Sequence, residues 1–256
     1  MEKVNKERER LFFNQVTEFK GRKLASKFYA AVESSRRYCE EFLISNCHNK
    51  RVLEYGCGTG SYSLLLAEHG AEVVGIDISD TRIEVARARA EERGLKNVTF
   101  LVMDAEMMQF EDDSFDMICG GGILHHLDIN KALRELTRVL KPEGKAIFIE
   151  PMGHNPLINL FRKLTPRSRT EDEHPLTAGD LELIRRFFRQ VNYRFFHLSS
   201  LLAVPFQGTG VFPSLLKTLD GFDERLFERV PSLELLAWQV VLILERPRKF
   251  TSAAHR

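Results

Sequence analysis

The sequence predicts an α/β fold in which helices cover both faces of a mostly parallel sheet of seven strands, and two observations carry this prediction. From residue 51 onward, apolar segments of strand length alternate with segments of helical character, which is typical of strands joined by right-handed helical crossovers. The first strand also runs into a turn with glycine at every second position, Glu54-Tyr-Gly-Cys-Gly-Thr-Gly60, and a helix follows. Such a unit lets a flat ligand lie against bare backbone at the carboxyl end of a sheet.

Residues 1–48 are expected to form an N-terminal helical segment. Its apolar residues recur at roughly helical spacing with charged residues between them. They are Phe28, Ala31, Val32, Tyr38, Phe42 and Leu43. We expect an amphipathic helix that lies over the sheet edge or over the mouth of the active site. Contact with a membrane surface is the alternative.

Residues 49–150 are expected to form the ligand-binding core. Strands are predicted at 52–55, 72–76, 98–102, 115–119 and 145–149, and helices at 61–68, 80–93 and 129–140. Gly94 suits the end of the second helix, because glycine readily adopts the left-handed conformation. Pro142 is expected to stop the third helix, and residues 141–144 to form a turn with proline second and glycine fourth.

Residues 151–256 break this rhythm and are expected to form a substrate cap together with the closing strands of the same domain. Strands are predicted at 191–197 and 236–244, with the cap inserted at 151–235. Arg169 and His174 are candidates for binding an anionic group, and a lid held by local ion pairs is the alternative. Five phenylalanines suggest a largely apolar acceptor site, although they suit an ordinary core equally well. They are Phe161, Phe187, Phe188, Phe206 and Phe212.

Composition argues against several classes of protein. The 37 basic and 36 acidic residues nearly cancel, unlike those of a chain that coats nucleic acid. The four cysteines form no C-x-x-C pair and no cluster with histidine, so neither a disulfide framework nor a zinc site is expected, and a cytoplasmic location is predicted. The charged N-terminus is unlike a signal peptide, and the sequence contains no run of 18 apolar residues that would indicate a transmembrane helix.

The motifs, taken in order, resemble those of the class I S-adenosylmethionine-dependent methyltransferases, in a branch that modifies small molecules or lipids. The resemblance rests on E-x-G-x-G-x-G at 54–60, on acids that end the second and third strands, and on the segment 115–127. It implies S-adenosylmethionine as cofactor and S-adenosylhomocysteine as product, with no metal required. The residues implied for cofactor binding are Glu54, Tyr55, Gly56, Gly58, Gly60, Asp77, Ile78, Asp104, Ala105, Gly120 and Gly121.

Three carboxylates have expected roles, each with a structural alternative. Asp77 ends the second strand, where the family holds both ribose hydroxyls; the alternative is a cap for the next helix. Asp104 is expected to accept from the adenine amine, with Ile78 on the adenine face, and a turn aspartate is the alternative. Glu54 either orients the glycine loop and reaches the methionine amino group, or is a buried carboxylate bonded to loop N–H groups.

Two histidines follow the fourth strand and its glycine triplet. His125 or His126 is a candidate base for a substrate hydroxyl, because the unperturbed pKa of histidine lies near neutrality; packing or capping is the alternative.

We expect in-line methyl transfer to a small-molecule or lipid-like acceptor, at oxygen. A nucleic-acid or protein methyltransferase is less favoured, because enzymes that methylate base nitrogens carry N-P-P-[YF] or D-P-P-[YF] where this chain has Gly-Gly-Gly-Ile-Leu at 120–124. A non-catalytic cofactor-binding protein is the third hypothesis. Peripheral membrane contact stays open.

Overall fold

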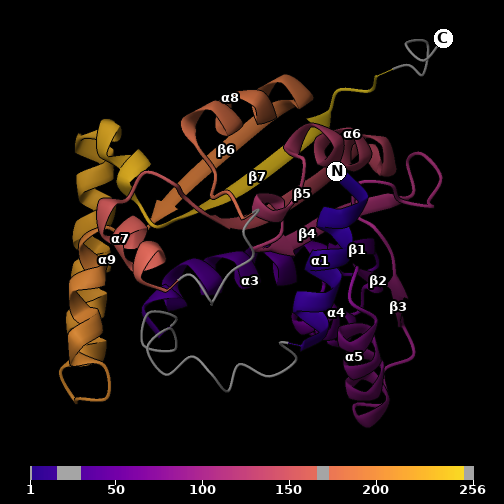
Figure 1. Ribbon diagram of the computed structural model, residues 1–256, viewed down its shortest axis with the longest axis horizontal. Coiled ribbons are helices and arrows are strands. Elements are labelled where there is room, and N and C mark those ends of the chain that lie inside the picture. The colour runs from indigo at the N-terminus through magenta and orange to yellow at the C-terminus, as the bar shows by residue number, and fades with distance from the viewer. Residues whose placement is uncertain (1, 16–29, 166–172, 251–256) are drawn as a thin grey trace.

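A seven-stranded sheet forms the centre of the computed structural model, which describes residues 2–15, 30–165 and 173–250 (Figure 1). The strands are β1 Arg51–Tyr55, β2 Glu72–Asp77, β3 Val98–Val102, β4 Phe115–Gly121, β5 Leu140–Pro151, β6 Phe188–Phe196 and β7 Gln239–Pro247. They lie in the order β3-β2-β1-β4-β5-β7-β6. The first five pair in parallel, whereas β7 pairs antiparallel with both β5 and β6. The predicted fold class is therefore confirmed.

Helices cover both faces of this sheet. One face carries α3 (Glu33–Cys47), α4 (Ser61–Glu68) and α5 (Asp80–Glu92), and the other carries α6 (Ile129–Val139) and α8 (Ala178–Phe187). Side chains alternate along a strand, so neighbouring residues enter opposite cores. Within β1, the second residue packs toward α3 and α4, whereas the third joins the core beneath α6 and α8. Both faces of the parallel strands are thereby buried.

The segment before the fifth parallel strand differs from the prediction. Residues 141–144 belong to β5 and do not form a separate turn. The pairing explains the difference: Phe115 lies opposite Leu140 and Met117 opposite Lys145, so β5 bulges between these two pairs. A bulge accommodates Pro142, which has no N–H to give to the ladder. Helix α6 ends at Val139, because Leu140 is already extended and paired.

The two closing strands are offset from their predicted positions. β6 begins at Phe188, directly after α8, and ends one residue before His197. β7 begins at Gln239, because the residues before it form a 3-10 helix, η6 (Pro231–Leu236), which starts with a proline. Proline suits the first turn of a helix, where its missing N–H has no partner to lose. Both strands nevertheless join the same sheet as the core.

The remaining elements lie at the carboxyl edge and beside β6. The N-terminal elements are α1 (Glu2–Gln15) and η2 (Ala30–Val32), and η3 (Leu124–His126) follows β4. The elements after β5 include α7 (Pro156–Leu164), η5 (Ser199–Phe206) and α9 (Phe212–Arg229), and α7 and α9 lie near the end of β6 in Figure 1.

The apolar residues singled out in the sequence lie in different parts of the structure. Ala31, Val32 and Leu43 are buried as predicted, whereas Phe28 lies outside the described residues. Phe187 and Phe188 belong to the main core under α6 and α8. Within the described ranges, no helix has the combination of length and apolar character needed to cross a bilayer.

Candidate active site

The glycine turn after β1 adopts a backbone that only glycine tolerates well. Gly56, Gly58 and Gly60 all have positive φ values, of 72°, 52° and 83°. An added Cβ at Gly56 would lie 2.6 Å from the side chain of Ile123, and one at Gly60 would lie 2.9 Å from the ring of Phe100. The backbone conformation therefore favours glycine at all three positions, and close packing also requires it at Gly56 and Gly60. The turn leaves bare backbone at the carboxyl end of the sheet.

Glu54 lies beneath this turn and supports it. Its side chain is buried and accepts the N–H of Ser63 at 2.7 Å and that of Tyr62 at 3.3 Å, together with the Ser63 hydroxyl. These N–H groups open helix α4, where a carboxylate is favoured by the helix dipole. Burial nevertheless dominates and raises the pKa of Glu54 to about 7. The structure thus places Glu54 as a buried carboxylate that fixes the start of a helix.

Asp77 ends β2 and ties two loops together. Its Oδ2 accepts the N–H of Gly58 at 2.8 Å, and its Oδ1 accepts the N–H of Ser79 at 2.8 Å. The cap of helix α5 is Ser79, whose hydroxyl accepts the N–H of Arg82. The alternative role of Asp77 as that cap is therefore wrong. Burial raises the pKa of Asp77 above its ordinary value.

Asp104 follows β3 and faces the N-terminal helix. Lys6 of α1 lies 2.6 Å from Oδ1 of Asp104 and 3.0 Å from Glu106. The same Oδ1 accepts the N–H of Glu106. Tyr55, which the resemblance implies for cofactor binding, is fully buried and donates its hydroxyl to the carbonyl of Ala105. It supports the loop from below.

A cavity opens at this edge of the sheet and gathers residues from distant parts of the chain. Seven of the predicted site residues line it: Gly56, Asp77, Ile78, Asp104, Ala105, Gly121 and His126. The other six predicted residues are not among its lining: Glu54, Tyr55, Gly58, Gly60, Gly120 and His125. None of the described cap phenylalanines lines it either.

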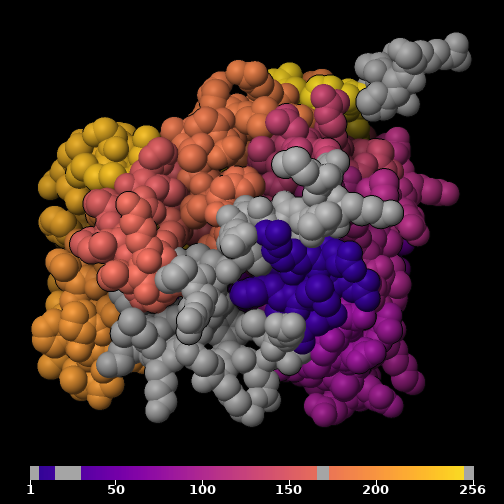
Figure 2. All heavy atoms as spheres, viewed as in Figure 1, coloured from indigo at the N-terminus to yellow at the C-terminus, as the bar shows by residue number. Residues whose placement is uncertain are grey.

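Helix α1 contributes three further residues to the cavity that no sequence motif indicated. They are Lys6, Glu9 and Phe13. Figure 2 shows α1 in indigo lying on the front of the core. Two contacts fasten it to the start of α5, an ion pair of Arg10 with Asp80 and a hydrogen bond between Asn14 and Ser79. The helix at the cavity is therefore α1, whereas the apolar pattern on which the expected amphipathic helix rested falls on α3, which packs against a face of the sheet.

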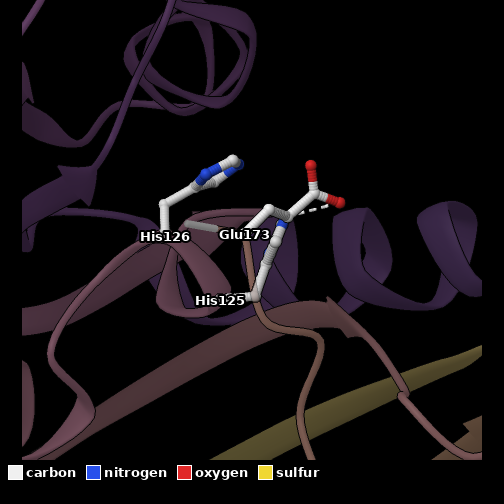
Figure 3. Close-up of side chains that lie close together, drawn as sticks. All are labelled: His125, His126 and Glu173. Carbon is white, nitrogen blue, oxygen red and sulfur yellow. Dashed lines mark ion pairs between the residues drawn. The ribbon is translucent and has the colours of Figure 1, made fainter. Parts of the chain in front are cut away.

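The two histidines of η3 have different surroundings. His125 is buried, and its Nδ1 lies 2.7 Å from Oε2 of Glu150 at the end of β5. Burial lowers the pKa of His125. His126 lines the cavity and makes an edge contact with Phe13, with ring centroids 5.4 Å apart. Glu173, from within the predicted cap, approaches His125 with its Oε1 3.9 Å from Nε2 (Figure 3).

Of the predicted anion-binding pair, only His174 lies among the residues that the structure describes, and it does not line the cavity. Arg169 lies outside them. His174 is exposed, and its backbone N–H donates to the carbonyl of His125 at 2.9 Å. Arg162 of α7 bonds instead to the carbonyl of Met152 and the side chain of Asn159.

Known proteins resemble this chain in sequence and in fold. Residues 46–184 match a family model described as a methyltransferase domain. The chain is 40% identical over 113 residues to the uncharacterized methyltransferase YcgJ of Bacillus subtilis and 43% identical over 104 residues to a demethylmenaquinone methyltransferase of Thermus thermophilus. It is 37% identical over 100 residues to a ubiquinone biosynthesis O-methyltransferase of Coxiella burnetii.

These matches cover 43%, 40% and 39% of this chain and 45%, 47% and 42% of the respective relatives, so the chain spans less than half of each relative's length. The crystal structure of YcgJ shares the fold, with a TM-score of 0.55 at 22% identity, over 82% of this chain and 99% of that one. With a family model that matches more than half of its residues, the chain belongs to the methyltransferase domain family, among the class I S-adenosylmethionine-dependent methyltransferases.

Proposed function

We propose that the protein transfers a methyl group from S-adenosylmethionine to an oxygen of a small-molecule or lipid-like acceptor. The observation that carries this proposal is the cavity at the carboxyl edge of the sheet. There Asp77, Asp104 and His126 converge with the bare backbone of Gly56 and Gly121. Ligands of open α/β sheets bind at this edge, and each of these groups suits one part of the cofactor.

The ribose and the adenine are assigned to two carboxylates. Asp77 accepts both ribose hydroxyls, because each of its oxygens has acceptor capacity beyond the one backbone N–H that it takes. Asp104 accepts the exocyclic amine of adenine, beside the backbone of Ala105, and Ile78 packs on the face of the ring. The methionine part lies along the glycine turn, where Gly56 permits close approach.

The reaction then needs little beyond orientation. The acceptor oxygen attacks the methyl carbon in line with the sulfur; the new C–O bond forms as the C–S bond breaks, and its electrons pass to sulfur, which leaves S-adenosylhomocysteine. Orientation and exclusion of water supply roughly 7–11 kcal/mol at best. The acceptor proton passes to His126, the histidine that lines the cavity. A base contributes about 10²–10⁴-fold for a hydroxyl acceptor.

The acceptor class rests on the relatives. One is named for demethylmenaquinone and another for the biosynthesis of ubiquinone by O-methylation. From these two names we infer that the acceptor of this chain is an amphipathic molecule with a hydroxyl group. The apolar members of the cavity lining, including Phe13, Ile123 and Leu127, are compatible with such a molecule.

Calorimetric titration with S-adenosylmethionine and S-adenosylhomocysteine tests the cofactor, and radiolabelled methyl transfer to hydroxyl compounds, nucleic acid and protein tests the acceptor. We expect micromolar binding of both cofactor forms and label only in a hydroxyl compound. Label in nucleic acid or protein would replace the acceptor class, and binding without any turnover would favour the non-catalytic hypothesis. His126→Ala should lower turnover at least about tenfold, whereas His69→Ala, at an exposed histidine on the far end of α4, should not.

A further inference from the structure

We propose that His125, His126 and Glu173 form a binding site for a divalent transition-metal ion of the zinc type, beside the cavity that His126 lines. Each residue offers one ligand atom, and the three atoms lie within 4.8 Å of one another. Figure 3 shows the two rings and the carboxylate gathered around one space. Two imidazoles and one carboxylate bind zinc in catalytic sites and leave a further position open.

The orientation of His125 suits a metal ligand. A histidine that binds a metal almost always donates its other ring N–H to a carboxylate or a carbonyl, which fixes the ring and its tautomer. Here Nδ1 of His125 lies 2.7 Å from Glu150, and Nε2 is the nitrogen that faces Glu173. Glu150 is itself held by the N–H groups of Ile123 and Leu124, at 2.9 and 2.8 Å. The ring is therefore locked with Nε2 turned toward the proposed ion.

His126 repeats this arrangement with a second carboxylate. Its Nδ1 lies 3.5 Å from Oε1 of Glu9, and we assign its Nε2 to the ion. Glu9 is only 5% exposed, and its Oε1 accepts no hydrogen bond from the part of the chain that the structure describes. A buried carboxylate oxygen without a hydrogen bond is costly. An ion on His126 polarises the ring and strengthens its Nδ1–H as a donor, which would draw this oxygen into a normal hydrogen bond.

The distances are those of a site that has to contract slightly. In a tetrahedral zinc site with bonds of about 2.0–2.2 Å, the ligand atoms stand roughly 3.3–3.5 Å apart. His125 and Glu173 are already at 3.9 Å. No separation among the three ligand atoms exceeds 4.8 Å, so an ion requires the three side chains to move inward by roughly 1 Å. Sequence spacing did not indicate this site, because Glu173 is distant in the chain from the two histidines.

The role of the ion rests on the proposed function, whereas its binding does not. His126 lines the cavity in which we place the methyl acceptor. An ion there lowers the pKa of a hydroxyl that coordinates it. His126 then acts as a ligand, and the ion takes over the task that the preceding proposal gives to a base. The acceptor proton leaves to water as the oxygen binds the ion.

Direct metal binding provides the test. The full chain, free of any affinity tag, is dialysed against a chelator and titrated calorimetrically with Zn²⁺, and Co²⁺ absorption reports the coordination. We expect one ion per chain and a tetrahedral cobalt spectrum. Glu173→Gln and His126→Ala should each weaken Zn²⁺ binding at least about tenfold. Glu9→Gln should weaken it about 10- to 100-fold, as for other carboxylates that orient a ligand. His69→Ala, at a surface histidine, is the matched control.

Two results would overturn the site: binding of less than one ion per chain, or equal affinity in the Glu173→Gln variant and the parent. Glu173→Gln is nearly isosteric and keeps the fold testable if His126→Ala does not fold. Titration with S-adenosylmethionine in the presence of chelator separates the two proposals. Cofactor binding without Zn²⁺ binding refutes the metal site alone, and Zn²⁺ binding without cofactor binding refutes the proposed function alone.

Discussion

Replacing Asp77 by alanine is the sharpest test of the cofactor assignment. The carboxylate lines the cavity, and its two oxygens already hold the N–H groups of Gly58 and Ser79 at 2.8 Å each. Removing it therefore has two effects. It deletes the proposed acceptor for the ribose hydroxyls, and it releases the glycine turn from the end of β2.

The magnitude follows from the type of hydrogen bond that is lost. A hydrogen bond to a charged group contributes about 1.5–3 kcal/mol. At 1.36 kcal/mol per factor of ten, Asp77→Ala should raise the dissociation constant of S-adenosylmethionine roughly 10- to 160-fold. The lower limit applies if water replaces the carboxylate well. The upper limit applies if the loosened turn also loses its fit to the methionine part.

Calorimetric titration of the variant with S-adenosylmethionine and S-adenosylhomocysteine measures the effect, below the melting temperature determined by circular dichroism. Glu84→Ala is the matched control, because it removes an exposed carboxylate from helix α5 nearby. Asp77→Asn is the second variant in case alanine impairs folding. A dissociation constant within twofold of the parent value, in a folded Asp77→Ala variant, would refute the ribose assignment.

Three further predictions concern stability, each measured by urea unfolding. The pKa of Glu54 is about 7 in the folded protein and 4.5 ordinarily, so the folded state holds a proton that the unfolded chain loses. The contribution of Glu54 to the free energy of unfolding is fully present below pH 4.5 and should fall by roughly 3 kcal/mol as the pH rises through 7. Glu54→Gln should remove this contribution and change the dependence of stability on pH accordingly. An equal slope in both proteins would contradict it. Gly60→Ala should lower the free energy of unfolding by about 1–3 kcal/mol more than Gly94→Ala does. Both glycines have positive φ, but only a side chain at position 60 would meet the ring of Phe100. Equal losses in the two variants would disprove this clash. Leu133→Ala, in the core under α6, should lower the free energy of unfolding by about 2–5 kcal/mol. A loss below about 1 kcal/mol would count against a tightly packed core.

Local pattern was sufficient to predict the core of the fold. Helix α4 and strand β3 begin and end at the predicted residues, because glycine and turn residues bound short apolar segments there. Prediction failed where long-range pairing decides the outcome. Whether residues 141–144 form a turn or a bulged strand depends on their pairing with Phe115 and Met117 of a neighbouring strand. The sequence of residues 141–144 alone carries no information about this pairing.

The same distinction between local pattern and long-range contacts applies to the residues of the site. Asp77 and Asp104 were predictable because Asp77 ends β2 and Asp104 closely follows β3, and the carboxyl ends of parallel strands meet at one edge. The contribution of α1 was not, since Lys6 and Phe13 reach the cavity from a helix that precedes the sheet and carries no motif.

One device recurs at this edge of the sheet and links stability to function. Glu54 at the end of β1 holds the first N–H groups of α4, Asp77 at the end of β2 holds the turn after β1, and Glu150 at the end of β5 holds the loop after β4. Burial raises the pKa of the first two, so the fold keeps them despite a cost in free energy. Loops alone would leave the glycine turn and the histidines mobile. Carboxylates on the strands instead tie these loops to the sheet by hydrogen bonds, and the methyl transfer that we propose depends on such orientation.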